Sequence, residues 1–111
     1  MKDGDVILAK LPQQDGTEKD RPTLCLCRVP PFHDLLVCGI STQLQQAAPE
    51  LDELITLTES DFRTSGLKAP SLIRLGYLGV VPASTCKGRI GSISAARLNR
   101  LRARLSDFIK P

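Results

Sequence analysis

The sequence has 111 residues, of which 41% are hydrophobic, and its formal net charge at pH 7 is +3. This length fits one domain with its own hydrophobic core, so we expect a single domain over residues 1–111. No apolar run approaches the roughly 18 residues of a transmembrane helix. Residues 1–5 lack the apolar segment of a signal peptide, so we expect a cytoplasmic protein without a membrane anchor.

The charges are distributed unevenly along the chain. Residues 1–60 contain five Lys or Arg against ten Asp or Glu, a balance of −5, whereas residues 61–111 contain ten against two, a balance of +8. A basic C-terminal half could bind a polyanion such as RNA. Alternatively, the two halves interleave in space and their charges compensate each other.

The four cysteines do not indicate a disulfide framework or a metal site. Cys25 and Cys27 are two residues apart on one predicted strand, where both would face the same side and a disulfide would be strained. The spacings of Cys38 and Cys86 do not match a zinc ribbon. A site made with His33 has little support, and the carboxylates are scattered, so we predict packed thiols, no metal and no other cofactor.

Two apolar segments near the N-terminus have the character of β-strands. They cover residues 5–11 and 23–28, and the polar loop 12–20 between them contains the Asp15-Gly16 pair that is typical of a chain reversal. Residues on both faces of the first strand are apolar, so we expect both faces to be covered.

Arg21 lies where this loop is predicted to meet the second strand. Pro22 restricts Arg21 to an extended conformation and is itself tolerated at the first residue of a strand. A guanidinium group held in this way suits a phosphate partner, because its N–H groups form a planar fork. The alternative is a charged hairpin loop, with Glu18 and Lys19, that keeps the edge of a sheet soluble.

The run 35–40 is continuously apolar and predicts a central strand. It is followed directly by Ser41, Thr42 and Gln43, which place two hydroxyl groups and an amide at the end of a buried segment. The alternative role for these hydroxyls is to cap a short turn or helix that extends through Gln45.

The remaining pattern predicts short strands and one helix. Leu98, Leu101, Leu105 and Phe108 form one apolar helical stripe, and we expect the arginines beside it to be solvated while the helix packs on the sheet. This pattern favours a mainly β protein, a small antiparallel sheet or barrel with a C-terminal helix. The other expected elements are strands at 54–58, 71–75, 77–81 and 87–93, a helical turn at 59–64 that ends before Gly66, and the helix at 94–109 with Ser94 as its cap.

Four segments in this order resemble the MazF/PemK-type toxins of bacterial toxin-antitoxin pairs. They are Gly4–Leu8, Lys19–Pro22, Gly39–Gln43 and Gly66–Leu75, and with the final helix the resemblance covers nearly the whole chain. It implies an SH3-like barrel that pairs as a homodimer and is neutralised by a cognate antitoxin protein. It also implies sequence-selective, metal-independent cleavage of single-stranded RNA, including mRNA, by attack of the ribose 2′-OH.

The resemblance also implies roles for individual residues. It places the catalytic positions on Arg21 and Ser41, where many members have Thr in place of the serine. Because consecutive strands commonly pair, and Arg21 precedes one strand while Ser41 follows the next, we expect both at one edge of the sheet. The general base stays open between Glu18 and His33. The predicted substrate-binding residues are Glu18, Lys19, Thr42, Gln43, Lys68 and Arg74.

Two other classes of function stay open. One is a toxin of the same fold that binds a protein target such as DNA gyrase and does not cut RNA. The other is an SH3-like interaction module, which normally needs an aromatic groove. Three Phe, one Tyr and no Trp make such a groove difficult to build.

Overall fold

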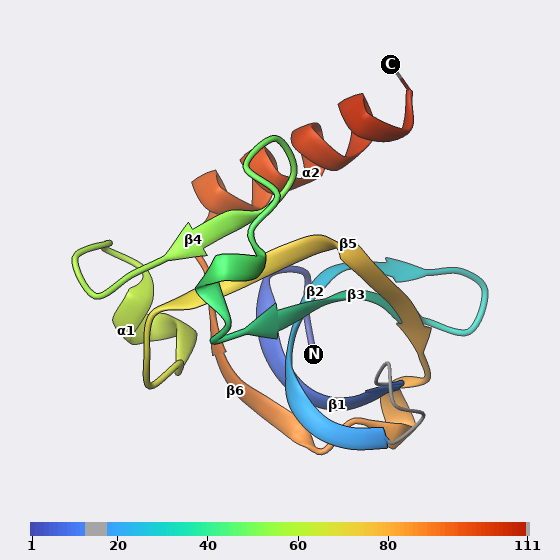
Figure 1. Ribbon diagram of the computed structural model, residues 1–111. Coiled ribbons are helices and arrows are strands. Elements are labelled where there is room, and N and C mark those ends of the chain that lie inside the picture. Colours follow the sequence, from blue (N-terminus) through green and yellow to red (C-terminus); the bar gives the residue numbers. More distant parts are fainter. Residues whose placement is uncertain (13–17, 111) are drawn as a thin grey trace.

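A computed structural model describes residues 1–12 and 18–110, and its strands form one antiparallel sheet. The order of the strands in this sheet is β4-β5-β3-β2-β1-β6, so the predicted strand 35–40 occupies a central position. The C-terminal helix lies across the outside of the sheet (Figure 1). The elements are β1 Asp5–Pro12, β2 Glu18–Val29, β3 Asp34–Ser41, η1 Leu44–Gln46, β4 Glu53–Ile55, α1 Phe62–Ser65, β5 Ser71–Val81, η2 Ala83–Thr85, β6 Gly88–Ser92 and α2 Ala95–Ile109.

The sheet curls strongly into a small barrel, in which the edge strands β4 and β6 do not pair with each other (Figure 1). Register shifts occur in three of its ladders: at Val6/Ile7 in β1–β6, at Cys25/Cys27 in β2–β3 and at Cys38/Gly39 in β3–β5. Each shift bends a strand and increases its twist, which allows so few strands to curl so far. The mainly β prediction with a C-terminal helix is confirmed.

Two apolar clusters cover the two faces of this sheet. Val6 belongs to the outer cluster under α2, whereas Ile7, Ala9 and Leu11 belong to the inner cluster enclosed by the curl. This division explains why both faces of the first strand are apolar, and it confirms that prediction. Burial of apolar side chains on both faces stabilises this small sheet, because one face alone would bury too little apolar surface.

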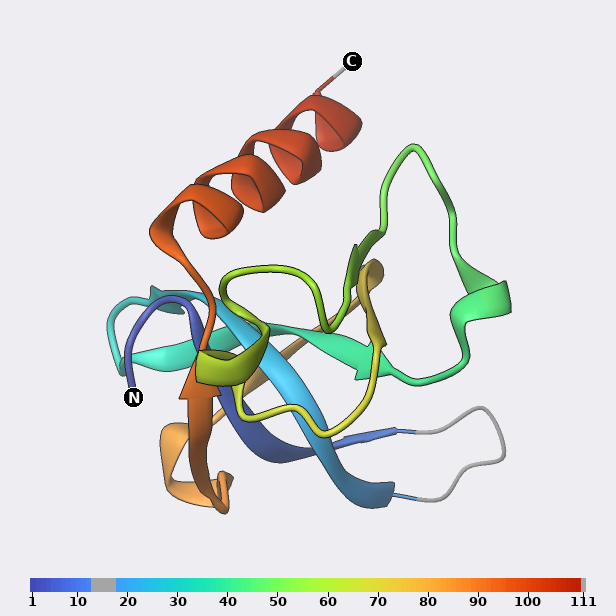
Figure 2. The same cartoon turned by 90° about the vertical axis from the view of Figure 1, so that its left-hand side faces the viewer.

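Helix α2 begins at its predicted cap, where the Ser94 hydroxyl accepts a hydrogen bond from the Arg97 backbone N–H at 3.1 Å. Leu98 and Leu101 are buried against the sheet, but Phe108 is 61% exposed. The expected apolar stripe therefore covers only the first part of the helix, because the second part rises away from the sheet (Figures 1 and 2).

Strand β2 begins at Glu18, earlier than predicted, so Arg21 and Pro22 lie within the strand and not at a junction. They pair with Ala9 and Leu8 of β1. The Leu8 carbonyl accepts from the Lys87 N–H, on the β6 side. Leu8 and Pro22 thus form a non-hydrogen-bonded pair of the β1–β2 ladder. The nitrogen of Pro22, which carries no hydrogen, faces away from β1, so the proline removes no hydrogen bond from this ladder.

The segments predicted as separate strands at 71–75 and 77–81 form the single strand β5, bent at the register shift opposite Gly39. The strand predicted at 54–58 corresponds to β4, which is shorter and begins earlier, at Glu53. The helical turn predicted at 59–64 corresponds to α1, which begins later, at Phe62. Gly66 ends that turn as expected, with φ of 76°. A side chain there would meet the Ile90 carbonyl oxygen at 2.1 Å from its Cβ, so only glycine fits.

All four cysteines are free thiols, as predicted. Burial raises the pKa of Cys25 to about 11 and that of Cys38 to about 12, so both stay protonated at neutral pH. Cys25 packs in the inner cluster, whereas Cys27 lines a hollow beside α2. The expectation that both face one side is wrong, because the bulge between them changes the alternation.

Candidate functional site

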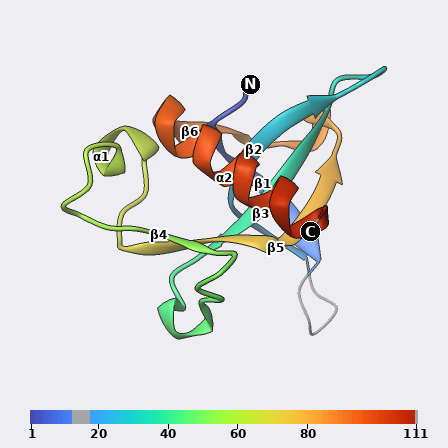
Figure 3. The same ribbon diagram turned by 90° about the horizontal axis from the view of Figure 1, so that it is seen from above.

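A hollow of about 490 Å³ opens where β2 and β3 reach the same end of the sheet. Its lining comes from the four neighbouring strands β5, β3, β2 and β1 and from the segment that follows β3, which projects from the sheet in Figures 2 and 3. Among the described residues that line it, none is acidic. They are Leu11, Arg21, Pro22, Gly39, Ile40, Ser41, Thr42, Gln43, Gln46, Arg74 and Tyr77.

Arg21 and Ser41 both line this hollow, although 20 positions separate them in the sequence. The last pair in the β2–β3 ladder is Thr23 with Gly39. Extending that antiparallel register by two residues sets Arg21 opposite Ser41 on the inner face of the sheet. The Ser41 hydroxyl is half-buried and accepts a hydrogen bond from the Gln43 backbone N–H at 3.0 Å. It can still donate its own hydrogen to a ligand.

Arg74 contributes a second guanidinium group from β5, where it pairs with Gly39. Its side chain lies over the Tyr77 ring, 5.6 Å from the ring centroid, and its Nη1 donates to Gln46 Oε1 at 3.5 Å. Gly39 leaves room for this ring, because a Cβ there would lie 3.1 Å from Tyr77 Cδ1. Arg74 Nε is buried, and among the described residues it has no hydrogen-bond acceptor. A buried N–H without an acceptor is costly and indicates a place where a ligand oxygen could bind.

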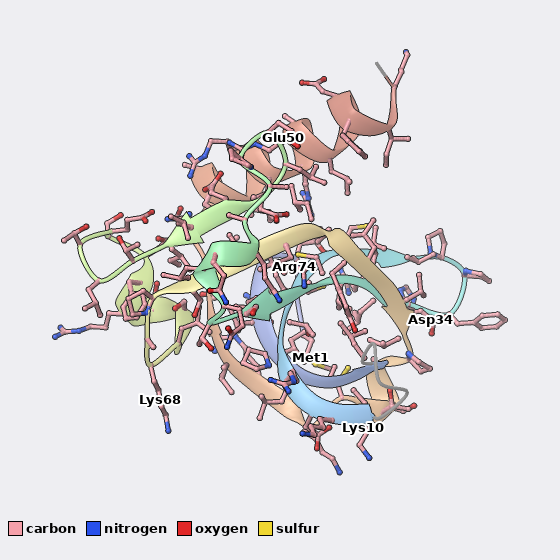
Figure 4. The ribbon with its side chains drawn as sticks, in the orientation of Figure 1. Met1, Lys10, Asp34, Glu50, Lys68 and Arg74 are labelled. Carbon is pink, nitrogen blue, oxygen red and sulfur yellow. The ribbon has the colours of Figure 1, made fainter. Side chains whose placement is uncertain are left out.

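The hollow includes some of the predicted site residues and not others. Thr42 and Gln43 line it, while Lys19 and Lys68 are exposed and are not among its lining residues. Figure 4 shows Lys68 pointing away from the molecule, whereas Arg74 lies near η1 and β3. The Glu18 side chain and the Asp15-Gly16 turn are outside the described residues.

His33 lies at the opposite end of β3 from Ser41. It is exposed in the turn between β2 and β3 and has a φ of 61°. At about 3.3 Å per residue, the strand between them separates His33 from Ser41 by roughly 25 Å. His33 is therefore too far away to serve as a base for chemistry at Ser41.

Gln46 and Tyr77 are lining residues that the sequence analysis missed. Gln46 follows Gln43 by one 3₁₀ turn, so the polar run after the central strand was the available signal. Tyr77 could not be found in this way, because its position depends on the bend in β5.

Half of the ten basic residues in 61–111 form ion pairs elsewhere. Arg89 pairs with Asp5, Arg102 with Asp3, and Arg97, Arg100 and Arg104 with carboxylates of residues 53–61. These ion pairs join the two halves of the chain, which is the alternative in which their charges compensate each other. Within the described part of the chain, Arg21 and Arg74 make no ion pair, which leaves their guanidinium groups available in the hollow.

Arg97 is the centre of this charge network and not the solvated residue that the helical pattern predicted. It is 3% exposed, and it donates to Asp61 Oδ2 at 2.8 Å, to Glu53 Oε1 at 2.7 Å and to Glu59. Burial by itself would raise the pKa of Asp61 and of Glu59, but hydrogen bonds and the charge of Arg97 outweigh it and lower both.

Two further features bear on the class of protein. Over residues 1–12 and 18–110, no three His, Cys, Asp or Glu side chains are grouped so that they could hold a metal ion. None of the helices that the structure describes is both long and apolar enough to cross a membrane.

Fold and site together define a small, curled β-sheet protein with a polar, cationic hollow at one end of its central strands. The sequence matches the family of PemK-like, MazF-like toxins of type II toxin-antitoxin systems over residues 2–109, and the chain belongs to this family. None of the curated proteins matches it. Among solved structures, the fold is similar to that of the Mycobacterium tuberculosis toxin MazF-mt6, with 20% sequence identity, 95% of each chain covered and a TM-score of 0.70.

Proposed function

We propose that this toxin is a sequence-selective endoribonuclease that cuts single-stranded RNA without a metal ion. The observation that supports this most directly is the hollow, where a hydroxyl and two guanidinium groups, which make no ion pair with the described residues, meet from three strands. Such a set of donors complements a phosphodiester, whose negative charge increases at the non-bridging oxygens as a nucleophile attacks. Membership of a family that contains RNA-cutting toxins supports the same reaction.

In this proposal the ribose 2′-OH loses its proton as its oxygen attacks the adjacent phosphorus. The bond from phosphorus to the 5′-oxygen breaks, the 5′-oxygen takes up a proton, and a cyclic phosphate and a 5′-hydroxyl end form. Arg21 stabilises the phosphoryl oxygens with its fork of N–H groups. Arg74 provides a second positive charge, and its Nε–H has no acceptor within residues 1–12 and 18–110. Ser41 donates a hydrogen bond to a non-bridging oxygen or orients the 2′-OH. Neither arginine offers a site for the proton, because a guanidinium group has N–H donors and no acceptor.

The proposed partners follow from the family. A type II toxin has an antitoxin, and a protein antitoxin would neutralise this chain by blocking the hollow. We also propose a homodimer in the cytoplasm, where the RNA substrate is found. Light scattering of the purified protein tests this assembly, since a dimer has twice the 12.1 kDa mass of the chain.

The experiment that tests the activity uses the purified protein with a long RNA of mixed sequence in EDTA, followed by mapping of the new ends. We expect cuts at a short repeated sequence, with cyclic phosphate and 5′-hydroxyl ends. Cleavage that disappears in EDTA and returns with magnesium would contradict the mechanism. Binding to a protein target such as DNA gyrase without any RNA cleavage would favour the alternative class of toxin.

A further inference from the structure

The segment directly after Ser41 and Thr42 presents three glutamine side chains at the rim of the hollow. Gln43, Gln45 and Gln46 are all exposed, and Gln43 and Gln46 line the hollow. Figure 2 shows this segment, with η1, projecting from the end of β3. It thus extends the floor of the site outward, toward the position of the nucleotides that flank a phosphate held in the hollow.

Hydrogen bonds hold these amides in place. Gln45 Nε2 donates to Gln43 Oε1 at 2.9 Å, and Gln46 Oε1 accepts from Arg74 Nη1 at 3.5 Å. The backbone N–H of Gln43 donates to the Ser41 hydroxyl. Amides that are oriented before a ligand arrives lose less conformational entropy when it binds.

The far end of this segment is attached to the strand that bears Arg74. Asp52 is 8% exposed, and its carboxylate accepts from the Ala48 N–H at 3.0 Å and from the Leu75 N–H at 3.1 Å. Leu75 lies in the part of β5 that the register shift leaves without a partner in β3, so Asp52 satisfies an otherwise unpaired N–H. The glutamine segment and Arg74 therefore share one anchor, which keeps the rim and the hollow in fixed relation.

Neutral amides at this rim suit a base better than a phosphate. A glutamine amide offers a donor and an acceptor side by side, which matches the adjacent donor and acceptor on the edge of a base. Single-stranded RNA exposes these edges to side chains. The positive charges that a phosphate needs come from Arg21 and Arg74, which line the same hollow.

We propose that Gln43 and Gln46 recognise a base next to the scissile phosphate and determine part of the cleavage sequence. This inference rests on the proposed RNA cleavage and names the residues that make it selective. It assigns Gln46, in addition to Gln43, to the substrate. Arg74 is the link between the two functions, since it contacts Gln46 and faces the same hollow.

The test compares Gln43→Met and Gln46→Met with the wild type and with Asn99→Met. Methionine keeps the length of glutamine without its hydrogen bonds, and Asn99 is an exposed amide on α2 that is not among the residues lining the hollow. Each protein is incubated with a randomised RNA library, and the cleavage products give a profile of its preferred bases. It then cuts the wild-type's preferred site and versions with one base changed, which yields kcat/KM for each.

We expect at least one glutamine variant to lose about tenfold or more of its discrimination at one base position, as for one good base contact. Asn99→Met should keep the wild-type profile. If both glutamine variants keep the wild-type profile at every position, or lose rate equally on all sequences, the inference is wrong while the cleavage activity stands. If the wild type cuts no RNA, the proposed function fails and this inference fails with it.

Discussion

Arg21 and Ser41 are held by different parts of the backbone. Arg21 lies within β2 and is exposed, while Ser41 ends β3 and is half-buried, with its hydroxyl oxygen bonded to a backbone N–H. Their shared position depends on the register of β2 with β3, so neither residue can shift without moving a strand. This rigidity is what a site needs when it stabilises charge that develops only in the transition state.

Substitution of these two residues tests their proposed roles. Ser41→Ala should lower the cleavage rate about a hundredfold, close to 3 kcal/mol, because a preorganised donor to the phosphoryl group is lost. Ser41→Thr should keep most of the activity. Arg21→Lys should fall into the same range as Ser41→Ala, because lysine keeps the charge but not the fork.

The matched controls for this series are Arg63→Lys and Ser84→Ala. Both residues are exposed and neither lines the hollow, so both variants should cut RNA at the wild-type rate. Single-turnover rates on one short RNA give the comparison, and circular dichroism verifies that each variant is folded. If both Arg21→Lys and Ser41→Ala cut RNA at the wild-type rate, the catalytic site lies elsewhere.

At the scale of elements, α2 is attached to the sheet by an apolar stripe and by the buried Arg97. The guanidinium group of Arg97 also donates to the Leu54 carbonyl oxygen, so it connects α2 to β4 and to the turn before α1. A buried arginine surrounded by carboxylates is costly to desolvate, but removing one partner leaves the others buried without compensation. This cluster therefore determines where α2 can lie rather than adding much net stability.

The pH dependence of stability should reveal this cluster. Since the pKa values of Asp61 and Glu59 are lowered in the folded state, their contribution is fully present above their unfolded pKa values, near 4. It is lost as the pH falls through the lower, folded values. Arg97→Met should destabilise the protein by about 3 to 5 kcal/mol at pH 7 and by less at pH 3, where Asp61 can be protonated.

Arg100→Met is the control on the same helix. The Arg100 side chain is 50% exposed and pairs with Glu53, so its loss should cost about 1 kcal/mol or less at either pH. Urea titrations at both pH values provide the free energies of unfolding. An equal loss of stability for Arg97→Met at pH 7 and at pH 3 would contradict the assigned role of the carboxylates.

At the scale of the whole molecule, the acidic and basic halves of the chain neutralise each other across the fold. Five of the ten basic residues in 61–111 pair with carboxylates, and four of the carboxylates involved come from residues 1–60. Besides the two arginines of the hollow, eight exposed Lys and Arg side chains make no ion pair with the described residues, and they are spread along the chain from Lys2 to Lys110. The net charge of the C-terminal half is thus a poor guide to the strength of RNA binding.

RNA binding should consequently depend only weakly on salt. With two or three phosphate contacts per hollow, the slope of log K against log salt for a single strand should be about −1.5 to −2. Fluorescence anisotropy with an RNA that has a 2′-deoxy group at the cleavage site measures this without turnover. A slope steeper than about −5 would mean that a much larger basic surface takes part.

Local rules determined much of the architecture from the sequence. Apolar runs of strand length predicted β1 and β3, the Ser94 cap and the apolar stripe predicted α2, and Gly66 marked the end of a turn. Each of these depends on residues within a few positions of each other, where propensity, capping and periodicity act directly. The order and spacing of short motifs were also sufficient to indicate the toxin family.

Tertiary structure decided what depends on contacts distant in the sequence. The early start of β2 follows from its pairing with β1, and the continuity of β5 follows from a register shift against β3. The meeting of Arg21, Ser41 and Arg74 needs both ladders, and the burial of Arg97 needs carboxylates at least 36 positions away. No local pattern encodes a register or the partner of a charge, because both are chosen by the packing of the whole chain.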